Sequence, residues 1–301
     1  METEKKPFQS APPEEPPPSQ VDLPVRVTPW QILLFVTTVL STTFVGAQHQ
    51  GVDPFQNPWH LLKGLPFSIS LMVILTSHEM GHYITSRRHR VRASLPYFIP
   101  APTLFGTLGA FIKMFPPIAN RTALLRIGMA GPLVGFVFSV AAAWLGLMWS
   151  TLIPLDQARD ALPLGSSLIF QAIVWLTLGE IPEGYDVLLH PVAFAGWIGF
   201  LVTALNLMPI GQLDGGHIAY AVSPSLHRSV SMGAIPVLLV LGVFLWPGWL
   251  LWAGLAAILG VGHPPVQDPR RPLQPQDQRL AAAALGLFVL CFVPVPVPLG
   301  P

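Results

Sequence analysis

Two histidines and a glutamate stand at the end of an apolar stretch, in the segment His78-Glu79-Met80-Gly81-His82. Residues four apart lie on one face of a helix, so both imidazoles can bind a single zinc ion. The glutamate between them can take a proton from a water molecule that zinc activates. We therefore predict that His78 and His82 bind one Zn²⁺ ion per chain and that Glu79 is a catalytic base.

A third protein ligand must come from a distant part of the chain, because catalytic zinc usually has three protein ligands and one open position. Asp214 is the strongest candidate, since Glu79 and Asp214 are the two acidic residues that lie inside apolar segments. Pro209 and Gly211 interrupt the segment that contains it, and irregular backbone at membrane depth needs surrounding protein or a water-filled cavity. His217, three residues further along, is the alternative ligand.

The composition is that of a membrane protein. Of the 301 residues, 51% are hydrophobic and 10% are charged, whereas soluble domains usually carry about 25% charged residues. The formal net charge is +1, so no basic field points to nucleic acid. The expected partners are therefore the lipid bilayer and proteins within it, and no nucleic acid.

Apolar segments that approach the length needed to cross a bilayer, about 20 residues as helix, recur from Trp30 onward. They predict an all-α polytopic membrane protein with about six to seven transmembrane helices. With a cytoplasmic N-terminus, the inner loops contain all but two of the 16 Lys and Arg residues, the exceptions being Lys63 and Arg159. This bias predicts that orientation. The segments are 30–47, 65–86, 124–150, 193–222, 231–246, 248–262 and 280–298.

The same pattern predicts four parts of the chain. Residues 1–29 are rich in proline and charge and predict a disordered cytoplasmic tail. Residues 30–262 form the main membrane domain, with its core at 65–222. A cytoplasmic loop, 263–279, and a C-terminal transmembrane helix, 280–301, complete the chain.

The motifs HEMGH at 78–82 and NLMPIGQLDGGH at 206–217 together resemble the site-2 protease family of intramembrane zinc metalloproteases. The resemblance covers roughly residues 65–222. Many members of that family contain an inserted PDZ domain, whereas the longest loop here, about 151–192, is too short for one. The resemblance implies zinc ligation by His78, His82 and Asp214, general base catalysis by Glu79, and positioning of substrate or oxyanion by Asn206.

Residues 97–114, YFIPAPTLFGTLGAFIKM, predict a small membrane-associated β-hairpin or re-entrant loop after the catalytic helix. Prolines and glycines interrupt this apolar stretch, which makes a straight helix unfavourable. The resemblance implies that the hairpin presents an edge strand to an unwound substrate. The alternative is an interfacial loop with no substrate role.

Small residues open the third apolar segment, in the sequence GMAGPLVG at 128–135. Gly131 and Gly135 are four residues apart, a spacing that favours close contact between membrane helices. We predict a structural role for them and no chemical one.

The predicted function is that of a hydrolase: an intramembrane zinc metalloprotease that cleaves peptide bonds within or next to transmembrane segments of substrate proteins, as in regulated intramembrane proteolysis. The alternative is a polytopic ion or proton transporter that uses the same buried His, Glu and Asp side chains. A transporter built from repeated halves would carry a second copy of a motif, and the sequence has none. The expected location is the bacterial inner (plasma) membrane, with a plastid membrane as the alternative, in a compact branch of the family without a PDZ domain.

Overall fold

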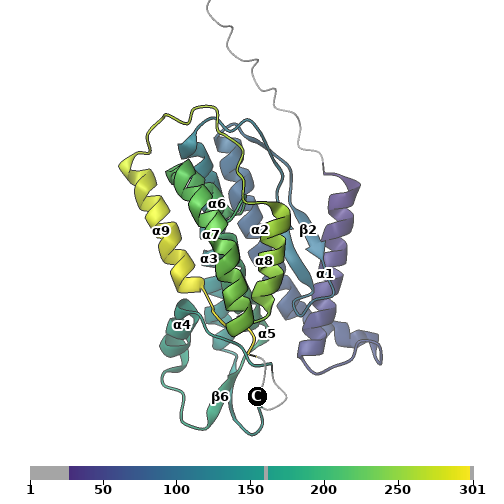
Figure 1. The fold of residues 1–301 in the computed structure, drawn as a ribbon. Coiled ribbons are helices and arrows are strands. Elements are labelled where there is room, and N and C mark those ends of the chain that lie inside the picture. The colour runs from purple at the N-terminus through teal and green to yellow at the C-terminus, as the bar shows by residue number, and fades with distance from the viewer. Residues whose placement is uncertain (1–26, 159–161, 299–301) are drawn as a thin grey trace, which may run out of the picture.

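The computed structural model describes residues 27–158 and 162–298, and these residues are mostly helical (Figure 1). Four of the described helices are long and apolar enough to cross a membrane. These are α1 (Pro29–His49), α2 (Leu65–Arg88), which the 3₁₀ helix η1 (Pro58–Gly64) precedes, α3 (Arg121–Leu147) and α7 (Pro224–Phe244). The shorter helices are α4 (Leu168–Leu178), α5 (Pro191–Asn206), α6 (Asp214–Val222), α8 (Gly248–Leu259) and α9 (Pro275–Cys291).

The segment expected at 193–222 is an interrupted helix, as its prolines and glycines predict. α5 ends at Asn206, the chain then forms a non-helical loop at residues 207–213, and α6 begins at Asp214. Gly211 lies in this loop with a φ of 51°, a left-handed conformation that favours glycine. The loop therefore separates two of the candidate site residues by a break in the helix.

Two helices differ in extent from the expectation. α7 begins at Pro224, before the expected 231–246, because the Ser223 side chain caps it and a proline suits the first turn. α9 begins at Pro275, inside the stretch 263–279 that was expected to be a loop, and ends at Cys291. The number of membrane crossings stays a prediction.

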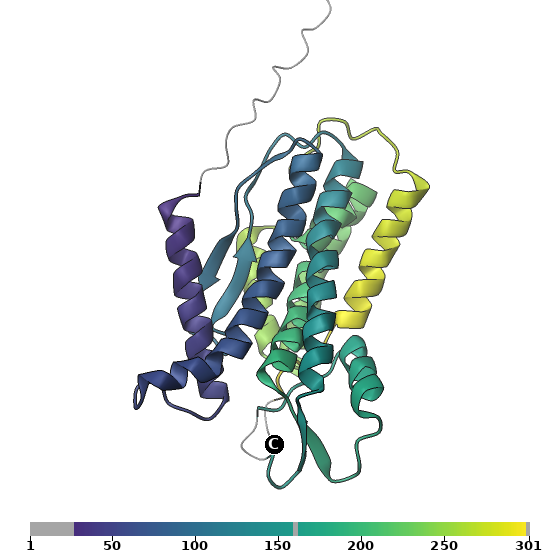
Figure 2. The ribbon, with the colours of Figure 1, turned by 180° about the vertical axis from the view of Figure 1, so that it is seen from behind.

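The strands form small antiparallel pairs, and one of these pairs is the hairpin expected after α2. β2 (Tyr97–Pro100) pairs with β3 (Thr107–Phe111), with Tyr97 opposite Phe111 and Pro100 opposite Thr107. These strands lie between α1 and α2 (Figure 2). The other pairs are β1 (Arg92–Ala93) with β4 (Met114–Phe115), and β5 (Thr151–Pro154) with β6 (Tyr185–Leu188).

α3 lies at the centre of the fold and contacts α2, α5 and α6 (Figure 2). Its side chains Leu124, Leu125 and Ile127 are fully buried. α7 instead exposes several large apolar side chains, as expected of a surface that faces lipid. Those side chains are Val237, Leu239, Val240, Val243 and Phe244.

Candidate metal centre and active site

The C-terminal half of α2 presents both histidines of the HEMGH motif on one face. His78 and His82 are one helical turn apart, and their side chains are buried. Their Nε2 atoms lie 3.2 Å apart. The helix therefore directs two potential ligand nitrogens to the same point inside the protein.

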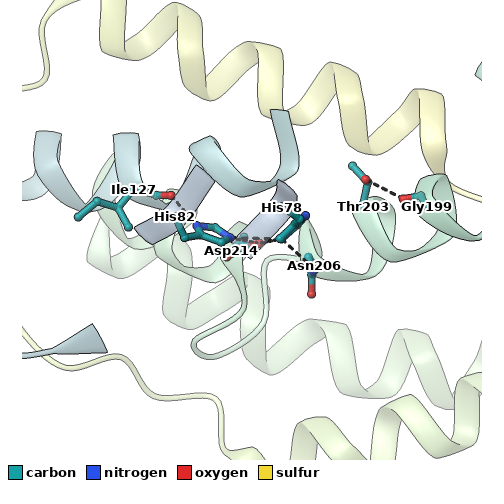
Figure 3. A network of polar contacts seen from close by, with 7 residues as sticks. All are labelled: His78, His82, Ile127, Gly199, Thr203, Asn206 and Asp214. Atoms are coloured by element: carbon teal, nitrogen blue, oxygen red, sulfur yellow. Dashed lines mark hydrogen bonds and ion pairs between the residues drawn. The ribbon is translucent and has the colours of Figure 1, made fainter. Parts of the chain in front are cut away.

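Asp214 reaches that point from the first turn of α6 (Figure 3). Its Oδ2 atom lies 3.2 Å from Nε2 of His78 and 3.2 Å from Nε2 of His82. Among the described residues, these three side chains form the one group of His, Cys, Asp or Glu residues that could hold a metal ion.

The three ligand atoms fit one zinc ion. Zinc lies about 2.0–2.1 Å from imidazole nitrogen, so neighbouring corners of its tetrahedron are about 3.4 Å apart. Each pair of ligand atoms is 3.2 Å apart, close to that value. Two imidazoles and a carboxylate also leave a fourth position for water, as in catalytic zinc sites.

A second contact fixes the orientation of the His82 ring. Its Nδ1 atom lies 2.8 Å from the carbonyl oxygen of Ile127 on α3. When Nδ1 donates a hydrogen bond there, the lone pair on Nε2 faces His78 and Asp214, which is the arrangement that a metal ligand needs.

Glu79 lies beside the ligand group and is 5% exposed. It interacts electrostatically with His78, His82 and Asp214. The backbone of Ile112, directly after β3, is within hydrogen-bonding reach of its carboxyl group. The predicted base therefore lies between the metal ligands and the hairpin.

Asn206 is the last residue of α5, and its side chain points to the ligand group (Figure 3). Its Nδ2 atom lies 3.3 Å from Nε2 of His78. An amide donor at this position is close enough to contact a group bound at the metal. The structure thus brings together all five side chains that the sequence predicts for the site.

The glycines of α3 lie directly against the metal ligands. A Cβ atom added at Gly131 would lie 2.0 Å from Nε2 of His82, and one at Gly135 would lie 2.8 Å from Nδ1 of His78. Any side chain at Gly131 would therefore occupy the space of the ligand nitrogen. These glycines allow close helix contact, as predicted, but they also make room for the metal site, which the sequence analysis did not predict.

His217 lies outside the group that could hold the metal. Its Nδ1 atom instead lies 2.7 Å from Nε2 of His263, in the segment between α8 and α9. Burial lowers the pKa of His263, which favours its neutral form in this contact. The alternative ligand of the sequence analysis is thus engaged in a different contact.

Two residues of α7 hold the loop that joins Asn206 to Asp214. Ser231 donates a hydrogen bond to the carbonyl oxygen of Pro209, at 2.9 Å, and accepts one from the backbone N–H of Gly211, at 3.2 Å. His227 Nε2 lies 2.9 Å from the carbonyl oxygen of Gly211. Sequence reasoning missed this role, because neither residue belongs to a motif.

The sequence profile of Peptidase family M50 matches residues 66–246, a range that includes every candidate ligand and Glu79. The chain belongs to Peptidase family M50. This membership confirms the predicted family. The triangle of His78, His82 and Asp214 could hold a metal ion of the kind that a metalloprotease requires.

Several plant proteins are similar to this M50 member. It is 28% identical to "Probable zinc metalloprotease EGY2, chloroplastic" of Arabidopsis thaliana over 88% of the chain and 48% of the relative. It is 30% identical to "Probable zinc metalloprotease EGY1, chloroplastic" of the same plant over 92% of the chain and 55% of the relative. It is 27% identical to "Probable zinc metalloprotease EGY3, chloroplastic" of Oryza sativa subsp. japonica over 92% of the chain.

The chain spans about half the length of these relatives. No solved structure matches it significantly. The relatives are named as chloroplastic, so their names do not favour the expected bacterial inner membrane. The long apolar helices support the coarser expectation of a membrane protein.

Proposed function

We propose that the chain is an intramembrane zinc metalloprotease that hydrolyses peptide bonds within or next to transmembrane segments of other proteins. The observation that carries this proposal is the triangle of His78, His82 and Asp214 ligand atoms beside Glu79, in a helix apolar enough to span a membrane. Family membership supports the metalloprotease chemistry. The long apolar helices that surround the group support a substrate that is itself in the membrane.

His78, His82 and Asp214 would hold the zinc ion, which supplies Lewis acidity toward a water molecule and the scissile carbonyl. Glu79 takes the proton of the attacking water on its carboxylate and passes it to the nitrogen of the leaving amine. Nearly complete burial keeps bulk water away from that carboxylate, so the transferred proton stays at the site.

Asn206 would stabilise the negative charge that develops on the scissile carbonyl oxygen. Its Nδ2 group lies 3.3 Å from Nε2 of His78, so a substrate carbonyl near the ligand group is within reach of this donor. The hairpin, which adjoins Glu79 through Ile112, would pair with a locally unwound substrate as an added strand.

Glu79→Gln tests the proposal, because glutamine keeps the shape of the side chain and cannot accept the proton. We expect zinc content equal to wild type and cleavage of a transmembrane reporter lowered by about 100- to 10,000-fold. Glu183→Gln is the matched control, since Glu183 is exposed in a loop. Undiminished cleavage by Glu79→Gln, or wild-type protein purified without bound zinc, would contradict the proposal.

The same site could serve an ion or proton transporter, but no observation favours that function over proteolysis. The family match supports the protease. For the topology, we propose that the N-terminus and the arginines that follow α2 lie on the cytoplasmic side of the membrane, because Lys and Arg concentrate in the loops on that side.

A further inference from the structure

We propose that an apolar pocket between the 207–213 loop and α8 receives one apolar side chain of the substrate, next to the bond that is cleaved. This proposal rests on the proposed function. It goes further because it assigns a determinant of substrate preference to residues outside the catalytic motifs.

The pocket is the size of a single side chain. Its volume is about 280 Å³, below the range of about 300–1,000 Å³ that is usual for small-molecule sites. An apolar cavity of about 150 Å³ is enough to bind benzene, so a leucine or phenylalanine side chain fits. The loop supplies Met208, Ile210 and Leu213, and α8 supplies Trp252, Leu255 and Ala256.

The chemistry of the walls selects an apolar occupant. Gln212 is the one side chain with a polar amide among those that line the pocket in the described part of the chain. A charged or strongly polar side chain would lose its hydration there without a compensating partner. A branched or aromatic side chain would gain from the removal of its apolar surface from water.

The position of the pocket connects it to the catalytic residues. The loop that forms one wall begins directly after Asn206 and ends directly before Asp214. Leu213 in that wall is adjacent in the chain to the metal ligand, so their Cα atoms are about 3.8 Å apart. A substrate side chain held against Leu213 would therefore lie next to the residue that supplies the third candidate ligand.

The pocket is preformed, because the loop is attached at several points. Ser231 bonds the backbone at Pro209 and Gly211, and His227 contacts the carbonyl oxygen of Gly211. A Cβ atom at Gly211 would lie 2.3 Å from the carbonyl oxygen of Gly260, which follows α8. The loop and α8 are thus in direct contact, and a rigid pocket loses little entropy when it binds a side chain.

Reporters that differ at one position test the proposal. Transmembrane reporters carry Ala, Leu or Phe at each residue on either side of the cleaved bond, and kcat/KM is measured with the zinc-loaded protein. For wild type we expect one position at which Leu or Phe raises kcat/KM about 10- to 100-fold over Ala. An apolar pocket discriminates by about this factor.

Leu255→Trp fills the pocket from α8. It should reduce the preference for Phe over Ala at that position to less than about threefold. Leu251→Trp is the matched control, because Leu251 lies on the same helix, is 71% exposed and does not line the pocket. Trp252→Ala enlarges the pocket and should raise kcat/KM for Phe relative to Leu, which provides a second test that needs no added bulk.

Two results would overturn the pocket: wild type that cleaves all reporters equally at every position, or Leu255→Trp and Trp252→Ala proteins that both keep the wild-type preference. If detergent or lipid composition changes the preference and the two substitutions leave it unchanged, the pocket binds a lipid chain. That result would also overturn the proposal. Failure of zinc-loaded wild type to cleave any reporter would instead contradict the proposed function itself.

Discussion

The helices that carry the candidate metal ligands, α2 and α6, both pack against α3 at glycines, whereas the hairpin is attached to α1 by side-chain hydrogen bonds and by one close backbone approach, at Gly106. At the metal centre, Gly131 leaves no space between α3 and the ring of His82. Along α1, side chains contact backbone oxygens of the hairpin, or of the segment just before it, at three levels. The contacts join Gln31 Nε2 to Leu95, at 2.8 Å, Ser41 Oγ to Gly106, at 2.6 Å, and His49 Nε2 to Leu104, at 2.8 Å.

The two kinds of attachment respond differently to mutation. A close-packed centre cannot accept added volume without a shift of its ligands. A strand held by separate hydrogen bonds loses stability in steps of about 0.5–1.5 kcal/mol for each bond removed. Zinc binding and substrate presentation should therefore be separable, and the following variants test that separation.

Asp214→Ala should have the largest effect, because it removes one of three ligands. We expect zinc affinity to fall by more than about 100-fold, beyond the range of about 10- to 100-fold for groups that only support a ligand. Zinc titration of the purified protein measures this affinity. His217→Ala is the comparison, and it should bind zinc far more tightly than Asp214→Ala. Unchanged zinc content in Asp214→Ala would make His217 the third ligand.

Asn206→Ala should lower kcat by about 100- to 1,000-fold, as the loss of one oxyanion donor does in other hydrolases. Zinc content should remain that of wild type, because Asn206 contacts a ligand but is not one. Metal analysis and reporter cleavage on the same preparation separate the two effects. Loss of zinc together with activity would instead show that Asn206 positions His78.

Gly131→Ala should weaken zinc binding by about 10- to 100-fold, because the new methyl group occupies the position of a ligand nitrogen. Gly233→Ala in α7 is the control, since a Cβ atom there meets nothing within 4 Å. Both substitutions also raise helix propensity equally, so a difference in zinc titration reports on the centre alone. Equal zinc affinity in the two variants would mean that α3 can move away from His82.

The parts of the site that follow from helix periodicity could be predicted from the sequence. His78, Glu79 and His82 share one helix, and Asp214 is one of two acids in apolar segments. The hairpin could also be predicted, because prolines and glycines prevent a helix there. Both signals are local, and local signals are what a single sequence carries most clearly.

Contacts between distant elements could not be predicted in the same way. Spacing indicates that Gly131 and Gly135 lie on one face of a helix, but not that the face meets two imidazoles. Ser231 and His227 hold the 207–213 loop through backbone oxygens, which have no sequence signature. The earlier start of α9 places Asp277 in the first turn of the helix, where it is buried and forms an ion pair with Arg126 of α3. This contact between distant elements has no signature in the sequence either.

Ser41→Ala should have the smallest effect of the four variants. It removes one hydrogen bond to the hairpin backbone at Gly106 and leaves the metal centre unchanged. If the hairpin presents the substrate, kcat/KM for a transmembrane reporter should fall by about two- to tenfold, with zinc affinity equal to wild type.

Thr37→Ala is the control for Ser41→Ala, because within the described residues the Thr37 hydroxyl bonds carbonyl oxygens of its own helix, at Leu33 and Leu34. Its kcat/KM should match wild type. If both variants have the kcat/KM of wild type, the hairpin is either held in place without Ser41 or has no role in cleavage. The double variant Gln31→Ala, Ser41→Ala distinguishes these two explanations. A double variant with full activity would show that the hydrogen bonds from Gln31 and Ser41 do not matter for the reaction.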